Sequence, residues 1–218
     1  MLPVQLLSHE RPSPAILCLG AHSDDIEIGA GGTILSLVER YPDSRILWVV
    51  FSGAAQRGDE ARSSGGAVLA QAKHAEIIVH AFRDGFFPAE FAQIKTTIES
   101  MKNFEPDIVF SHYRGDHHQD HRVISELTWN TFRNHLILEY EVPKYDPDLG
   151  NPSLFVPLSR EQAESKVATL MVHFRSQRDR SWFVPETFFA LLRLRGVQAA
   201  APSGYAEAFY ARKLWLIP

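Results

Sequence analysis

Cysteine is nearly absent from this sequence: Cys18 is the only one among 218 residues. A single cysteine excludes an internal disulfide framework and argues against a closed structural metal site, which is usually built from several thiolates. The scarcity fits a reducing compartment, so we expect a cytoplasmic protein. Because Cys18 lies in the apolar run AILCLG, we interpret it as an inert core residue.

Long apolar runs and a strong excess of one charge are also missing. No window approaches the roughly 18 consecutive apolar residues of a transmembrane helix, and the N-terminal MLPVQLLSHERPSP lacks the regions of a secretion signal. The formal net charge is −4, which indicates neither nucleic-acid binding nor membrane insertion. Hydrophobic residues make up 45% of the chain, and no linker divides it. We therefore expect one domain spanning residues 1–218.

The first half of the chain alternates short apolar runs with helical patterns. We expect buried strands over 15–21, 45–51, 76–82 and 106–113. Helices are predicted from Gly31-Gly32 to near Pro42, over 59–73 and over 89–104. This alternation is typical of an α/β fold with a Rossmann-like parallel sheet, right-handed crossovers and flanking helices.

The second half has longer and less regular segments. The patterns predict a helix over 121–140, an extended loop over 141–159, a helix opened by a Ser159/Gln162 capping box, a helix over 186–196 that Gly196 stops, and a last strand over 207–217. The loop carries four prolines. Because long loops in compact domains are usually lids or binding loops, we expect it to influence substrate choice.

Two polar clusters follow the first and fourth predicted strands. The first cluster is His22, Asp24 and Asp25. The second contains four of the ten histidines and two aspartates, which are His112, Asp116, His117, His118, Asp120 and His121. Adjacent carboxylates cost free energy when they are buried, unless a cation or a proton offsets their charge. The rest of the sequence therefore has to supply that cation or proton, or the first cluster is only a solvated loop.

Sheet topology brings the two clusters together. In a doubly wound sheet of order 3-2-1-4, the first and fourth strands are neighbours, and ligands bind at their carboxyl ends. Imidazole and carboxylate donors suit a catalytic Zn²⁺ site with an open position. Each cluster alone would fit a structural histidine, a helix N-cap or a solvated turn, but together they favour a metal site. A dinucleotide site is disfavoured, because the glycine spacing is not G-x-G-x-x-G and two aspartates would face the pyrophosphate.

The paired motifs AHSDDIE (21–27) and HQDH (118–121) resemble those of the LmbE-like, or PIG-L-type, zinc-dependent de-N-acetylases. The resemblance extends to RGDE (57–60), FRDGFF (82–87) and YAEAF (205–209). Ser23 stands where the family usually has proline, which would only stiffen the turn.

The resemblance implies one zinc ion per chain, or another divalent metal, held by three ligands, which are His22, Asp25 and His121. Asp24 matches the general base. His118 matches the residue that stabilises the oxyanion or protonates the leaving group, and we expect Asp120 to orient it and keep it protonated. Arg57 and Asp84 match positions that contact sugar-like substrates.

The predicted activity is hydrolysis of an N-acetylated sugar conjugate, a small molecule, to acetate and a free amine. The alternatives are a zinc hydrolase acting on another amide or ester, and a non-catalytic metal-stabilised sugar-binding protein. A peptidase of the zincin type would show H-E-x-x-H, which is absent. A protein that only binds should lack the base, yet Asp24 is present. The sugar, its aglycone and a homo-oligomeric state stay open.

Overall fold

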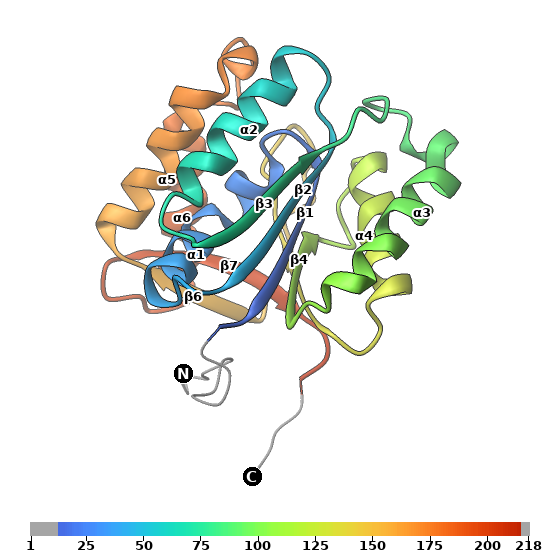
Figure 1. Cartoon of the computed structure of the whole chain (residues 1–218). Helices are drawn as coiled ribbons and strands as arrows, with labels where there is room; N and C mark the ends of the chain where they lie inside the picture. The colour runs from blue at the N-terminus through green and yellow to red at the C-terminus, as the bar shows by residue number, and fades with distance from the viewer. Residues whose placement is uncertain (1–12, 215–218) are drawn as a thin grey trace.

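The buried apolar runs pair into a seven-stranded sheet of order β3-β2-β1-β4-β5-β7-β6 (Figure 1). The computed structural model describes residues 13–214. Five strands run parallel, which are β1 (Ala15–His22), β2 (Arg45–Ser52), β3 (His74–Val79), β4 (Ile108–His112) and β5 (Leu136–Tyr140). The last two, β6 (Leu154–Leu158) and β7 (Tyr205–Ala211), are antiparallel additions. The predicted α/β class and 3-2-1-4 order are confirmed, but the sheet is mixed.

Helices cover both faces of the sheet (Figure 1). One layer contains α1 (Asp25–Arg40), α2 (Gln56–Val68), α5 (Arg160–His173) and α6 (Pro185–Gln198), and the other contains α3 (Phe91–Ser100) and α4 (Gln119–Thr131). Short 3₁₀ turns flank α3 at Phe87–Glu90 and Met101–Phe104, and another follows α5 at Arg175–Gln177. Alternate residues of each central strand therefore enter two separate cores.

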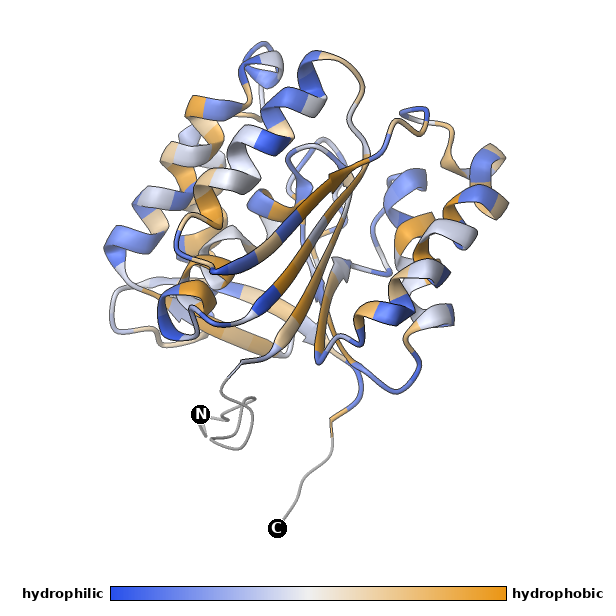
Figure 2. Ribbon diagram, in the orientation of Figure 1, coloured by the Kyte–Doolittle hydropathy of each residue, from blue (hydrophilic) through white to orange (hydrophobic). Residues whose placement is uncertain are grey.

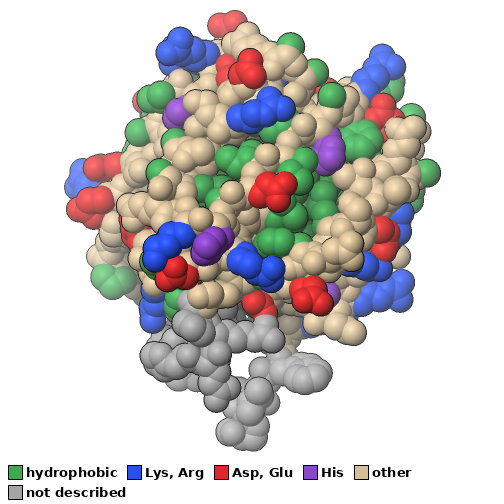
Figure 3. Space-filling model, viewed as in Figure 1, with side chains coloured by type: hydrophobic (Ala, Val, Ile, Leu, Met, Phe, Trp, Pro, Cys, Tyr) green, Lys and Arg blue, Asp and Glu red, His purple; other side chains and the backbone are tan. Residues whose placement is uncertain are grey.

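Strand β1 illustrates this division. Ile16 and Cys18 point into the core under the four-helix layer, whereas Leu17 and Leu19 point into the core under α3 and α4. Figure 2 shows the hydrophobic strands between helices whose outer faces are hydrophilic. On the face drawn in Figure 3, basic and acidic side chains are interspersed, in keeping with the small net charge. No helix of the described residues is long and apolar enough to cross a bilayer.

The first helix begins earlier than its glycines predict. α1 starts at Asp25 and runs through Gly29 and Gly32. A Cβ at Gly29 would lie 2.0 Å from the Tyr140 ring, and one at Gly32 would lie 2.4 Å from Leu158. The glycines therefore let the helix approach the sheet closely, and tertiary packing overrides their poor helix propensity.

Three other sequence predictions need correction. The segment 121–140 is not one helix: α4 ends at Thr131, and 136–140 forms β5 between β4 and β7. The predicted loop 141–159 contains β6. Gly196 does not end α6, which continues to Gln198; the glycine is required because a Cβ there would lie 2.0 Å from the carbonyl oxygen of Gly204.

Other boundaries agree with the sequence patterns. The Ser159/Gln162 capping box is confirmed: the Gln162 N–H donates to Ser159 Oγ at 3.1 Å, and the Ser159 N–H donates to Gln162 Oε1 at 2.9 Å. The last strand begins at Tyr205 and ends at Ala211. The end of the predicted 207–217 strand and the N-terminal 1–12 segment lie outside the described residues.

Candidate active site

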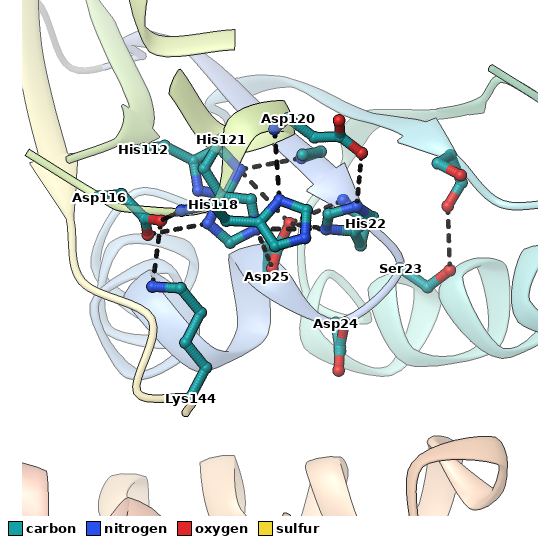
Figure 4. Close-up of polar contacts among 12 residues, drawn as sticks. His22, Ser23, Asp24, Asp25, His112, Asp116, His118, Asp120, His121 and Lys144 are labelled. Atoms are coloured by element: carbon teal, nitrogen blue, oxygen red, sulfur yellow. Dashed lines mark hydrogen bonds and ion pairs between the residues drawn. The ribbon is translucent and has the colours of Figure 1, made fainter. Parts of the chain in front are cut away.

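The two polar clusters meet at the carboxyl ends of the adjacent strands β1 and β4, as the topology predicts (Figure 4). His22 ends β1, and Asp24 is the N-cap residue of α1. His118 is the N-cap residue of α4, whose first turn carries His121. Two helix N-termini therefore open at the site, where their partial positive charge favours carboxylates. Residues that are almost a hundred positions apart in the chain are side by side.

His22, Asp25 and His121 form a donor cluster. His22 Nδ1 is 3.2 Å from His121 Nε2, and the two oxygens of Asp25 face one ring each: Oδ2 lies 3.4 Å from His22 Nδ1 and Oδ1 lies 3.4 Å from His121 Nε2. Adjacent donors of a tetrahedral ion with bonds of 2.0–2.1 Å lie about 3.3–3.4 Å apart. These pairwise distances are compatible with a small divalent ion, and a ring nitrogen of His118 lies within 4.8 Å of ring nitrogens of His22 and His121.

His121 has its second ring nitrogen occupied. His121 Nδ1 donates to Asp116 Oδ2 at 2.8 Å, and Lys144 Nζ lies 3.0 Å from the other oxygen of Asp116 and 2.5 Å from Asp148. Burial, reinforced by the neighbouring His112, lowers the pKa of His121 to about 4. The ring is therefore neutral at pH 7, with the Nε2 lone pair facing the donor cluster.

His22 is held by carboxylates in the same way. Its Nε2 lies 3.2 Å from Asp120 Oδ2 and 3.2 Å from Asp84 Oδ1, so Nδ1 faces the donor cluster. Burial by itself would lower the pKa of His22, but hydrogen bonds to Asp120 and Asp25 outweigh it and raise the pKa well above its usual value. A proton on His22 therefore competes with a metal ion for Nδ1.

The expected role of Asp120 needs correction. Its carboxylate accepts from the N–H groups of Gly85 at 2.7 Å and Phe87 at 3.1 Å and contacts His22, while only its backbone N–H donates to His118 Nδ1 at 3.2 Å. Burial, followed by the charge of His22, lowers the pKa of His118 despite the nearby Asp120. Asp120 therefore positions His22 and the 85–87 turn, and His118 is a neutral ring with its proton on Nε2.

Asp24 and Asp25 point in different directions. In Figure 4, Asp25 lies among the imidazole rings, whereas the Asp24 side chain points away from them. Burial, together with the charge of Asp25, raises the pKa of Asp24 to about 6. Arg57 opposes this shift from 4.0 Å and also forms a 2.6 Å ion pair with Asp84. Asp24 is therefore a buried carboxylate whose pKa suits proton transfer near neutrality.

A cavity of about 230 Å³ opens over these side chains. Its inner wall contains Asp24, His118, Arg57 and Asp84 together with the donor cluster, and its outer wall comes from segments 142–146 and 177–182. Arg57 Nε is buried there without a hydrogen-bond partner among the described residues. The cavity thus brings together every site residue that the sequence predicts, with the exception of Asp120, which lies behind His22.

Sequence reasoning missed three residues of the site. Asp116 stood within the histidine cluster but had no assigned role, and nothing in the sequence indicates that Lys144 reaches it. His112 is a structural residue, because its Nε2 accepts from the Ala21 N–H at 2.9 Å. An aspartate close to a ligand histidine, as in GDHHQDH, is the signal that could have identified Asp116.

Known proteins are similar to this chain in sequence and in fold. The family model PIG-L, described as GlcNAc-PI de-N-acetylase, matches residues 17–132. A protein of Escherichia coli K12, named uncharacterized deacetylase YaiS, is 28% identical over 182 residues, which cover 79% of this chain and 97% of that protein.

Two solved structures superpose over most of the chain. The N,N'-diacetylchitobiose deacetylase of Pyrococcus horikoshii does so with a TM-score of 0.72 and 22% identity, covering 93% of this chain and 86% of the other. The 4-carboxy-2-hydroxymuconate hydratase GalB of Pseudomonas putida KT2440 has a TM-score of 0.74 and 17% identity, covering 94% and 98%. Because a hydratase shares the fold, the reaction has to be argued from the site residues.

Proposed function

The chain belongs to the PIG-L (GlcNAc-PI de-N-acetylase) family, and from this premise we propose that it is a zinc-dependent hydrolase that removes the N-acetyl group from an amino-sugar conjugate. The observation that carries the proposal is the convergence of two imidazole nitrogens and the Asp25 carboxylate, with pair distances of 3.2–3.4 Å, beside a separate carboxylate, Asp24. Three ligands and an open position are typical of catalytic rather than structural zinc.

Two imidazoles and one carboxylate form a donor set that suits zinc. His22, Asp25 and His121 would hold the ion, and Asp116, Asp84 and Asp120 would keep the two rings oriented. The chemistry that zinc would supply there is polarisation of the acetamide carbonyl and a lower pKa, toward 7, for a water molecule. The surrounding carboxylates supply the negative charge that balances the ion.

Asp24 is the general base in this proposal. It accepts a proton from the attacking water as the water oxygen bonds to the acetamide carbon. The pKa of Asp24, raised to about 6 by burial and by Asp25, lets the same carboxyl group return the proton to the amine nitrogen when the C–N bond breaks. The products are acetate and a free amine, and no other reactant is needed.

His118 stabilises the developing negative charge on the carbonyl oxygen. Its Nδ1 accepts from the Asp120 N–H at 3.2 Å, so its Nε2–H is free to donate. A neutral donor suffices for this role, which is worth about 3 kcal/mol in comparable sites. Arg57 and Asp84, which line the cavity, contact sugar hydroxyls.

The test measures acetate release by the zinc-loaded protein from N-acetylated sugars with nucleotide, lipid, inositol and glycan aglycones. Asp24→Asn should keep the metal and the fold but lose about 10²–10⁴-fold in turnover, because the base is gone while the ligands remain. His121→Ala should lose the metal as well. Wild-type turnover in Asp24→Asn, or full metal occupancy in His121→Ala, would overturn the mechanism.

A further inference from the structure

The outer wall of the cavity carries three side chains that the proposed hydrolysis does not use, which are Tyr145, Arg180 and Trp182. We propose that they form a subsite for a ring-shaped aglycone that bears an acidic group, either a carboxylate or a phosphate. This inference rests on the proposed function, since it defines which conjugates reach the base Asp24.

Among residues 13–214, Arg180 is the cation of the cavity for which the structure shows no side-chain partner. Arg57 is paired with Asp84, and Lys144 with Asp116 and Asp148. The Arg180 guanidinium, in contrast, has neither a hydrogen bond nor an ion pair among the described residues, and it is exposed on the cavity wall. A free guanidinium presents paired N–H donors that match a carboxylate or a phosphate.

The two aromatic side chains lie on the same wall. The Tyr145 side chain is 67% exposed, and its ring centroid is 6.5 Å from that of Trp182 at an angle of 83°. Trp182 is fixed from behind by Phe183 at 5.4 Å and Phe188 at 6.5 Å. A rigid indole and an exposed phenol ring in one cavity offer apolar faces on which a flat or sugar ring can stack.

The segment that carries Arg180 is held in place from α2. Glu60 accepts from the N–H of Ser176 at 2.9 Å and from its hydroxyl at 2.5 Å, and the N–H of Arg180 donates to the Gln177 carbonyl at 2.9 Å. Because the turn is already formed, little ordering is needed when a ligand binds. The free cation therefore has a defined position beside the aromatic rings.

The overall charge of the cavity agrees with an acidic ligand. Its wall contains Asp24, Asp25, Asp84 and Asp146 against Arg57, Lys144 and Arg180. A bound divalent ion would make the wall net positive. With the other two cations paired, Arg180 is the group left to recognise a negative charge on the substrate.

The experiment compares 4-carboxyphenyl, 4-phosphophenyl and 4-methylphenyl N-acetylglucosaminides, which share a ring and differ in charge. For each we would measure kcat/KM for acetate release and, by calorimetry, Kd. The wild type should prefer the acidic compounds by about tenfold. Arg180→Gln should abolish that preference, Arg180→Lys should restore part of it, and Arg180→Glu should reverse it.

Two further variants define the subsite. Arg178→Gln is the matched control, since Arg178 is exposed on the same turn but donates to the Met171 carbonyl and lies outside the cavity; it should keep the preference. Methyl N-acetylglucosaminide, which has no aromatic ring, serves as the reference compound. Tyr145→Ala should weaken the binding of all three phenyl compounds more than the binding of this reference.

The outcomes separate the two proposals. Equal turnover and affinity for acidic and neutral compounds in the wild type, or a preference that survives in Arg180→Gln, would overturn the subsite while leaving the deacetylase function intact. Acidic compounds that bind through Arg180 but release no acetate would support the subsite and overturn the function.

Discussion

The pKa values of His22 and His121, which belong to the same donor cluster, are shifted in opposite directions because their neighbours differ. Burial lowers the pKa of His121 to about 4, while hydrogen bonds from His22 to Asp120 and Asp25 raise the pKa of His22 well above its usual value. Asp24, beside them, has a pKa raised to about 6 by burial and by Asp25. The surroundings of each side chain, rather than its chemical type, determine its role at this site.

Arg57→Gln tests the charge that acts on Asp24. Arg57 stabilises the ionised carboxylate from 4.0 Å, so removing it should raise the pKa of Asp24 further. Because the ionised base is the active form, the acidic limb of kcat/KM against pH should move to higher pH. An acidic limb that stays in place or moves to lower pH would contradict the assignment. Arg83→Gln, which removes a cation lying over Phe86, is the control.

Asp116→Asn tests how the ligand His121 is held. Loss of the charged acceptor at 2.8 Å should weaken zinc affinity by about 10–100-fold, as is typical of groups that orient a ligand histidine. Lys144→Met should weaken it less, because Lys144 acts through Asp116. Competition with a chelator measures both. Lys73→Met, which removes an exposed ion pair with Asp43, is the control and should leave the zinc affinity unchanged. An unchanged zinc affinity in Asp116→Asn would refute the proposed role of Asp116 in orienting His121.

At the scale of elements, α1 depends on contacts from distant strands and helices. Glu207 of β7 accepts from the N–H groups of Gly32 at 2.9 Å and Thr33 at 2.6 Å, and Lys166 of α5 donates to the Ile28 carbonyl at 2.6 Å. In a regular helix Gly32 would donate to Ile28, so buried side chains provide partners in the middle of α1. The helix that carries Asp25 is thus anchored to the second half of the chain.

Gly29→Ala and Gly66→Ala form a matched pair, since both replace a glycine inside a helix. A Cβ at Gly29 would lie 2.0 Å from the Tyr140 ring, so we expect a loss of about 3 kcal/mol in the free energy of unfolding. At Gly66 no atom lies within 4 Å, so the substitution should stabilise the protein by about 0.5–1 kcal/mol. Urea unfolding measures both, and equal effects would contradict the packing argument.

At the scale of the whole molecule, the site is shared between the two halves of the chain. The family model ends at residue 132, and the donor cluster lies within its match. The second half contributes β5, β6 and β7, the helices that cover α1, and the outer wall of the cavity. The proposed metal ligands and the outer wall of the cavity therefore come from different parts of the sequence.

Zinc should stabilise the whole fold, because the donor cluster joins β1 to α4. At a free concentration of 100 Kd, binding contributes about 2.7 kcal/mol, which raises Tm by about 5–10 °C in a chain of this size. The rise should shrink as the pH falls, because protonation of His22 competes with the metal. Calorimetry with and without chelator measures the rise in Tm. Asp24→Asn should keep this rise, because the proposed ligands remain. A rise in Tm that persists in His121→Ala would contradict the ligand set.

Local sequence determined the alternation of strands and helices and the position of both polar clusters. A buried strand such as 15–22 needs a short apolar run, and the 3-2-1-4 order that the structure has is a common order of doubly wound sheets. The convergence of AHSDD and HHQDH could be predicted for the same reason. These features depend on neighbours in the chain or on general rules of topology.

Features that depend on distant partners were decided only by the tertiary structure. Gly29 belongs inside a helix because Tyr140 lies against it, and 136–140 is a strand because β4 and β7 flank it. The Asp120 carboxylate contacts His22 rather than His118 because the 85–87 turn and His22 surround it, and only the Asp120 backbone N–H reaches His118. Hydrogen bonds and close packing act between atoms within a few ångströms, so such roles exist only once folding has brought the partners together.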